Sequence, residues 1–262
     1  RLAESLEISV ERQMPDGDTQ TFLVEKRVDW TGRASDVVVR SDSRVIFGGL
    51  VQTEDGRIVD AGGYVQASRA VDAIGGADAV TGTGLVVNAA SEIVVEGTWD
   101  YDAQGNRSRV DGGSYVDGSI SLKGVGDVDV YGLLLSGGRV IEQRDPVVGK
   151  YQGRSLDAYD VDSVILIEAN RQVVLGTDIT AGKRIDVIGG IDDRTPVAGD
   201  ADRQYDGTGL VMFGSSAVTT TREDSVINLA GKGDVKILAP AWVNMLDLGG
   251  WPVSVTGTLD QD

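Results

Sequence analysis

Apolar residues recur at alternate positions along most of this chain, in short runs separated by small or polar residues. The recurring template is apolar, any, apolar, any, small, three free positions, apolar, any, apolar, any, and then Gly or Ala. Seven segments follow it closely or loosely, namely 37–49, 85–97, 120–132, 165–177, 179–189, 210–220 and 227–239. A period of two is the spacing of a β-strand with one buried face. The pattern therefore predicts many short strands. It predicts no helix, because apolar residues are not spaced three and four positions apart over any sustained stretch.

The small residue in the middle of the template has a physical reason. We expect two strands of about three residues each to meet there at a corner, with successive coils stacked ~4.8 Å apart. A large inward side chain would strike its neighbours in the coils above and below, whereas Ala, Gly or Ser would not. Gly also tolerates the backbone angles of a bend. Strands that alternate with corners predict an all-β fold, a parallel β-helix or β-solenoid, with hairpin and loop insertions.

Polar segments between the repeats predict structures that project from the solenoid. Turn signals that contain Gly lie at 15–18, 54–57 and 103–106, and alternating residues flank them, which is typical of β-hairpins. Longer loops, each with one Pro, are expected at 144–160 and 192–207.

The repeats divide the chain into three parts. We expect an initial coil and hairpin in 1–36, a solenoid array with insertions in 37–239, and the start of a further coil or cap in 240–262. Because the first residue is Arg1 and a new copy of the template starts near Val253, we expect the chain to be a processed product or a piece of a longer array.

The composition narrows the range of functions that the chain could have. The chain has 262 residues, a formal net charge of −17, 41% hydrophobic and 5% aromatic residues, and no Cys or His. The core must therefore be built from Val, Ile and Leu, and the acidic balance disfavours a nucleic-acid partner, which needs clustered Lys and Arg. No run of 18 apolar residues occurs, so no membrane insertion is expected. A Ser-His-Asp triad and thiolate chemistry are excluded.

Two repeat-rich segments, 165–190 (ILIEANRQVVLGTDITAGKRIDVIGG) and 227–239 (INLAGKGDVKILA), resemble the repeats of filamentous-haemagglutinin-like adhesins and related giant bacterial surface proteins. The resemblance covers the coil portions of the chain. It implies an extracellular or bacterial cell-surface location, a rod-like shape and a non-enzymatic role in adhesion, biofilm or scaffolding. The implied partner is a surface glycan or a protein receptor. Open strand edges at a solenoid end would also let neighbouring copies assemble end to end, as in an extracellular filament.

One hairpin carries a candidate metal site. Asp100, Asp102 and Asp111 stand at the first, third and twelfth positions of a calcium-loop spacing, with Gly at the sixth. Gln104 at the fifth position and Arg107 at the eighth depart from that spacing. The alternative is a plain hairpin turn, which the preceding aligned insertion favours because it lacks the ligand series. Calcium is the one cofactor that the sequence offers.

The main rival hypothesis is a polysaccharide-binding or polysaccharide-cleaving β-helix. Glycoside hydrolysis needs two carboxylates about 5–9.5 Å apart, and Asp192 and Asp193 could form such a pair only in a loop, since neighbouring strand residues point to opposite faces. We assign no catalytic residue. Trp side chains that could stack on sugars, or cap the core, are Trp30, Trp99, Trp242 and Trp251.

Overall fold

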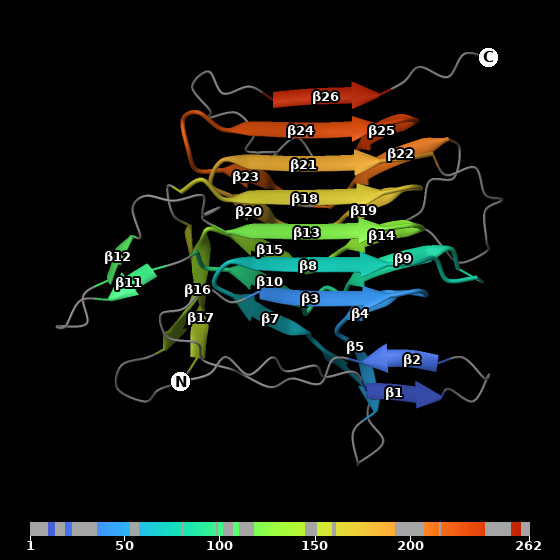
Figure 1. Ribbon diagram of the computed structural model, residues 1–262, viewed down its shortest axis with the longest axis horizontal. Coiled ribbons are helices and arrows are strands. Elements are labelled where there is room, and N and C mark those ends of the chain that lie inside the picture. Colours follow the sequence, from blue (N-terminus) through green and yellow to red (C-terminus); the bar gives the residue numbers. More distant parts are fainter. Residues whose placement is uncertain are drawn as a thin grey trace.

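In the computed structural model, the chain winds into a parallel β-helix whose three sheets run side by side along one axis (Figure 1). The structure describes residues 10–13, 19–22, 36–52, 58–79, 81–97, 99–101, 107–109, 118–144, 151–158, 161–191, 207–214, 216–238 and 253–257. Every helix or strand among these residues is a β-strand. The predicted all-β parallel β-helix is confirmed.

The first sheet has seven parallel strands, and six of them are six residues long. They are β3 (Asp36–Ser41), β8 (Ala70–Gly75), β13 (Ser119–Gly124), β18 (Val164–Ala169), β21 (Arg184–Gly189), β24 (Val226–Gly231) and β26 (Val253–Gly257). The predicted length of about three residues is wrong for this sheet, because the apolar pair and the following small residue all lie within one strand.

The second and third sheets have six and five parallel strands. The second consists of β4 (Val45–Phe47), β9 (Thr83–Val87), β14 (Asp127–Val130), β19 (Val173–Leu175), β22 (Thr208–Met212) and β25 (Asp234–Ile237). The third consists of β7 (Tyr64–Ala67), β10 (Glu92–Val95), β15 (Leu133–Ser136), β20 (Ile179–Ala181) and β23 (Val218–Thr220). Each coil that the structure describes completely thus has three strands, one per sheet, as β13, β14 and β15 show.

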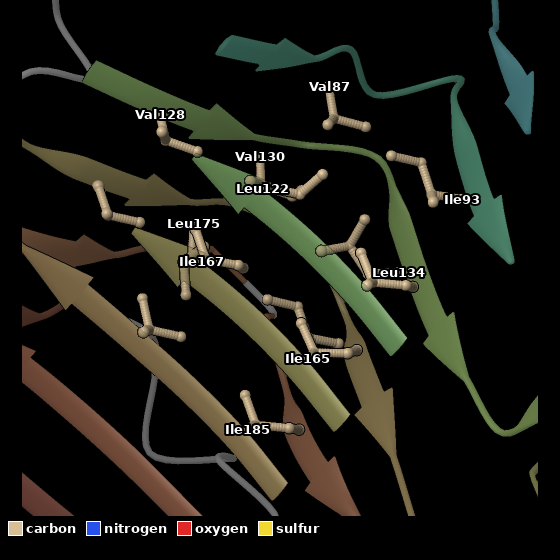
Figure 2. Packing of buried hydrophobic residues seen from close by; sticks show 14 of the residues in the cluster. Val87, Ile93, Leu122, Val128, Val130, Leu134, Ile165, Ile167, Leu175 and Ile185 are labelled. Carbon is tan, nitrogen blue, oxygen red and sulfur yellow. The ribbon is translucent and has the colours of Figure 1, made fainter. Parts of the chain in front are cut away.

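Apolar side chains of equivalent positions stack in columns inside the helix. In the first sheet Ile120 pairs in register with Ile165, and Ile165 with Ile185; all three side chains are buried. Figure 2 shows Ile165 and Ile185 one below the other, facing the core together with Leu134 from the third sheet. Stability therefore accumulates by stacking each coil on the next, through burial of Val, Ile and Leu.

Small residues form a column at the end of the first sheet. Its members, which are in register from strand to strand or directly follow the last registered pair, are Ser41, Gly75, Gly124, Ala169, Gly189, Gly231 and Gly257. A Cβ at Gly189 would lie 1.8 Å from the carbonyl oxygen of Gly209. Small residues are therefore required at this corner, but the predicted reason is wrong: Gly209 lies in β22, the next strand of the same coil, and not in the coil above or below.

Steric crowding does not explain the small residues at two other template positions, Ala89 and Gly214. Both are exposed and lie in turns between the second and third sheets. A Cβ at Gly214 would have no atom within 4 Å, but the residue has φ +74°, a left-handed conformation that favours glycine. At this corner the constraint is the backbone bend and not the space.

Four antiparallel hairpins accompany the coils in the part of the chain that the structure describes. Three match the predicted turns: β1 (Val10–Gln13) with β2 (Thr19–Phe22), β5 (Gly49–Gln52) with β6 (Ile58–Ala61), and β11 (Trp99–Tyr101) with β12 (Arg107–Arg109). The fourth pairs β16 (Gly138–Arg144) with β17 (Tyr151–Ala158). The loop expected at 144–160 is wrong in part, since β17 occupies eight of its residues. The polar composition of that segment hid its pairing with the preceding strand.

An ion pair joins the first two coils. Arg69, just before β8, donates from Nε to Oδ1 of Asp36 at 2.6 Å, and its Nη2 donates to Oδ2 of the same carboxylate. The hydrogen bond from Arg69, aided by its positive charge, lowers the pKa of Asp36 below 3.8 against the opposing effect of burial. The pair holds the outer edge of β3 to the start of the next coil.

Asp36→Asn is expected to reduce the acid sensitivity of the protein. Because the pKa of Asp36 is lowered on folding, the pair stabilises the fold above about pH 3.8, and this contribution is lost as the pH falls through the lowered value. Both side chains are partly exposed, so we expect about 0.5 kcal/mol. Urea unfolding at about pH 7 and about pH 3 measures the difference. An equal loss of stability in the wild type and the variant would contradict it.

Candidate interaction surface

One of the three predicted calcium ligands, Asp100, lies on the projecting hairpin β11–β12 (Figure 1). Asp100 is the middle residue of β11 and pairs with Ser108 of β12. Asp102 and Asp111 lie outside the described residues, so the calcium hypothesis stays a prediction. Within the described ranges, no three His, Cys, Asp or Glu side chains come together in a way that could hold a metal ion.

The residues proposed for sugar chemistry are mostly outside the described part of the chain. Asp192, Asp193, Trp30, Trp242 and Trp251 all fall there. Trp99 lies in β11, where it pairs with Arg109. The arrangement of these residues lies outside the described part of the chain, so the rival sugar hypothesis stays a prediction.

Each of the three sheets of the β-helix has an outer face. In the middle coils, the outer faces of the second and third sheets are buried. On the third sheet the outward side chains of Val94 and Leu135 are 1% and 0% exposed. On the second sheet the outward side chains of Val174 and Val211 are 0% and 1% exposed. Strand β16 packs beside β10 and contributes to the cover of the third sheet.

The outer face of the first sheet is different. Its outward side chains, at the first, third and fifth positions of β3, β8, β13, β18, β21 and β24, are all exposed or half-buried. Figure 1 looks directly onto these strands, and no other described element lies over them. We call these eighteen positions the open face.

The charges on the open face are almost balanced. Three side chains are positive and four are negative, a net charge of −1 against −17 for the whole chain. Six of them form three ion pairs within the face: Arg40–Asp72 at 3.7 Å, Lys123–Glu168 at 3.3 Å and Arg184–Asp186 at 2.5 Å. The seventh, Asp36, is paired with Arg69. The face is therefore close to neutral, with both signs interspersed.

Apolar side chains lie between these ion pairs. They include Ile74, Val164, Leu166, Ile188 and Val226, all half-buried at outward positions. Asp186 also accepts a hydrogen bond of 3.2 Å from Nδ2 of Asn228 in the next strand. The open face thus presents apolar and polar side chains side by side on parallel strands. Such a surface can bind a partner through many weak contacts at once.

An ion-pair cluster lies beside the open face, where the third sheet turns into the first. Nζ of Lys183 is 3.4 Å from Asp162 and 3.5 Å from Asp224, and Nε of Arg222 is 3.4 Å and 2.7 Å from the same carboxylates. The hydrogen bond from Arg222 is the main cause that lowers the pKa of Asp224, and Lys183 adds to it. The acidic groups here already have cations, so the cluster links coils and is not an empty anion or cation site.

Buried polar groups line the corner between the first and second sheets. Oδ1 of Asp127 accepts a hydrogen bond of 3.2 Å from the backbone N–H of Gln172. Nε2 of Gln172 donates to the carbonyl oxygen of Thr208 in the next coil at 3.3 Å. All three residues are completely buried. Because no ligand can reach them, they serve the stacking of coils, as buried polar groups with partners commonly do.

An aromatic contact bridges the corner between the second and third sheets. The rings of Tyr131 and Phe213 lie 6.0 Å apart between centroids at 60°, a tilted geometry that aromatic pairs favour. Gly176 stands in the coil between them, and a Cβ there would lie 2.9 Å from Tyr131 and 3.0 Å from Phe213. Gly176 thus lets the two rings meet across an intervening coil. Since the rings pack on each other at an angle, they form no flat platform for a sugar.

The sequence analysis missed the open face, although the sequence carries a signal for it. Strands buried on both faces read as continuous apolar runs, as in 93–95, 133–135, 173–175 and 210–212. In the first sheet β13 (SISLKG) alternates instead, whereas β18 (VILIEA) begins with four consecutive apolar residues. Alternation in the sequence therefore marks some strands of the open sheet, and burial is needed to recognise the others.

These features define the class of the protein: a repeat protein with a parallel β-helix fold, three strands per coil and one open face. A scan of protein-family models, a search of the curated proteins and a search of the solved structures found no match to this chain. No helix among the described residues is long and apolar enough to cross a membrane.

Proposed function

We propose that this chain is a non-enzymatic structural and adhesive segment of a secreted bacterial surface protein, and that the open face is its adhesive surface. The observation that carries the proposal is the contrast between the faces. The second and third sheets are covered over their middle coils, whereas the first sheet exposes apolar and paired charged side chains from β3 to β24. Apolar side chains that stay accessible on an uncovered sheet can contribute to the binding of a partner.

The likeness of 165–190 and 227–239 to the repeats of filamentous-haemagglutinin-like adhesins supports the same proposal. Stacked coils make a rigid rod, because each coil contacts only its neighbours and the columns of side chains continue through all of them. A rod that carries hairpins on its sides and one open face suits adhesion, biofilm formation or an extracellular scaffold. Placement outside the cell follows from that likeness and is part of the proposal.

The rival function is cleavage of a polysaccharide. Such an enzyme needs two free carboxylates on opposite sides of one glycosidic bond. On the open face, each of the carboxylates Asp72, Glu168 and Asp186 already contacts a Lys or Arg side chain. This arrangement favours recognition of a surface over general acid catalysis.

Two measurements test the proposal. Incubation with a panel of acidic and neutral polysaccharides is expected to release no reducing ends, and beads coated with the protein are expected to be retained under flow by a surface or by one another. Release of reducing ends would contradict the non-enzymatic assignment. Beads that are retained no better than beads coated with an unrelated acidic protein would contradict the adhesive one.

A further inference from the structure

We infer that the open face binds the open face of a second copy of this chain, so that two β-helices pack side by side. The inference rests on the proposed function, because it names the partner of the proposed adhesive surface. It differs from end-to-end assembly, which would use strand edges, since here the contact is made by the side chains of the first sheet.

Electrostatics favours this partner. Two copies that each carry −17 repel one another over most approaches. That repulsion is small at the open face, because its described side chains sum to −1 and six of its seven charges are paired within the face. A cationic partner would instead be drawn to the acidic remainder of the chain. Interspersed charges of both signs also allow one face to complement its own copy, as a twofold contact requires.

The chemistry of the face disfavours a sugar. None of its eighteen outward positions holds an aromatic residue. The face therefore lacks the flat rings on which a sugar could stack. Its apolar members are aliphatic, such as Val164, Leu166 and Ile188. Aliphatic side chains on sheets interdigitate well with those of another sheet, at a spacing of about 10 Å.

The area is sufficient for a specific contact. Six strands at ~4.8 Å spacing, each six residues long at ~3.3 Å per residue, cover roughly 600 Å². Two such faces would bury about 1,200 Å² in total, the lower end of the range for specific and stable protein interfaces. We therefore expect a dimer of moderate affinity, which the display of many copies on one surface would strengthen.

Sedimentation equilibrium tests the inference. The average mass of the wild-type chain is expected to rise toward that of a dimer between about 1 and 200 µM. Leu166→Lys and Ser121→Arg place a cation in the middle of the open face, next to Asp186 and Asp72 of neighbouring strands, where the fold tolerates it. Each is expected to weaken dimerisation at least about tenfold. Val125→Lys, at an exposed corner off the face, is the matched control and is expected to dimerise as the wild type does.

The outcomes separate the inference from the proposed function. A wild-type chain that stays monomeric at 200 µM, or a dimer that all three variants weaken equally or not at all, overturns the inference. Beads retained by a foreign surface without clumping would then leave the proposed adhesive function standing. Circular dichroism of Leu166→Lys and Ser121→Arg, matched to the wild type, excludes misfolding as the cause of a lost dimer.

Discussion

A methyl group added at Gly189 is expected to destabilise the protein by about 3 kcal/mol, a large effect for Gly→Ala. The reason is the close approach of β21 and β22 at the corner of one coil: the new Cβ would lie 1.8 Å from the carbonyl oxygen of Gly209 and 2.4 Å from its carbonyl carbon. Both are backbone atoms, so no side chain can rotate away and the corner must shift as a whole. Loss of chain entropy in the unfolded state would offset only a fraction of this cost. Urea unfolding followed by circular dichroism measures it.

Ala169 provides the control for Gly189. It occupies the same column of small residues in the preceding coil, and its methyl group is accommodated there with 4% exposure. Ala169→Gly is expected to cost about 1 kcal/mol, from greater freedom of the unfolded chain and the loss of one buried methyl group. If Gly189→Ala cost no more than Ala169→Gly, the corners would not be packed as tightly as the stacked coils require.

Ile167→Ala is expected to lower the free energy of unfolding by about 3 kcal/mol. Ile167 is completely buried in β18 and lies in register between Leu122 of the coil before and Val187 of the coil after. Figure 2 shows its side chain pointing into the core beside Leu175. Truncation would remove buried methyl groups and leave a cavity in the core. The backbone hydrogen bonds between neighbouring coils fix their spacing, so the coils cannot move together to close it.

Leu166→Ala is the matched control, because Leu166 is the adjacent residue and points to the open face. It is half-buried on the outer side of β18, and we expect a loss of less than about 1 kcal/mol. Both variants are measured by urea unfolding at a concentration of about 1 µM, where self-association contributes little. Equal losses at the two positions would mean that the strand does not separate an inner face from an outer one.

The sequence alone was sufficient for the architecture but not for the path of the chain around it. Alternating apolar residues located the strands, and the small residue located the corner of the first sheet. The same template, however, spans the first and second sheets in 120–132 and the second and third in 85–97. The spacing of apolar residues does not show to which of the three sheets a strand belongs. For that reason strands such as β8 and β15, which complete their coils, were not predicted.

The interaction surface was harder to predict for a related reason. Outward positions carry both apolar and charged residues on all three sheets, and only burial tells the faces apart. Leu135 and Leu166 are both outward leucines in the middle of a strand, yet the first is buried and the second half-exposed. What covers a face depends on insertions that pack from elsewhere in the chain, such as β16 beside β10. The ion pairs of the open face likewise depend on register across coils, which the sequence does not show.

Distances along one column of the open face test the stacked helix most directly. Because the chain has no Cys, spin labels can be attached to introduced cysteines at position 228 and at 38, 72 or 121, with each labelled protein diluted in unlabelled chain. Val38 and Asn228 lie five coils apart in register, Asp72 and Asn228 four, and Ser121 and Asn228 three. The stacked helix predicts backbone separations of about 24, 19 and 14 Å, falling by one interstrand spacing per coil. Separations that do not fall in equal steps, or that change order, would contradict it.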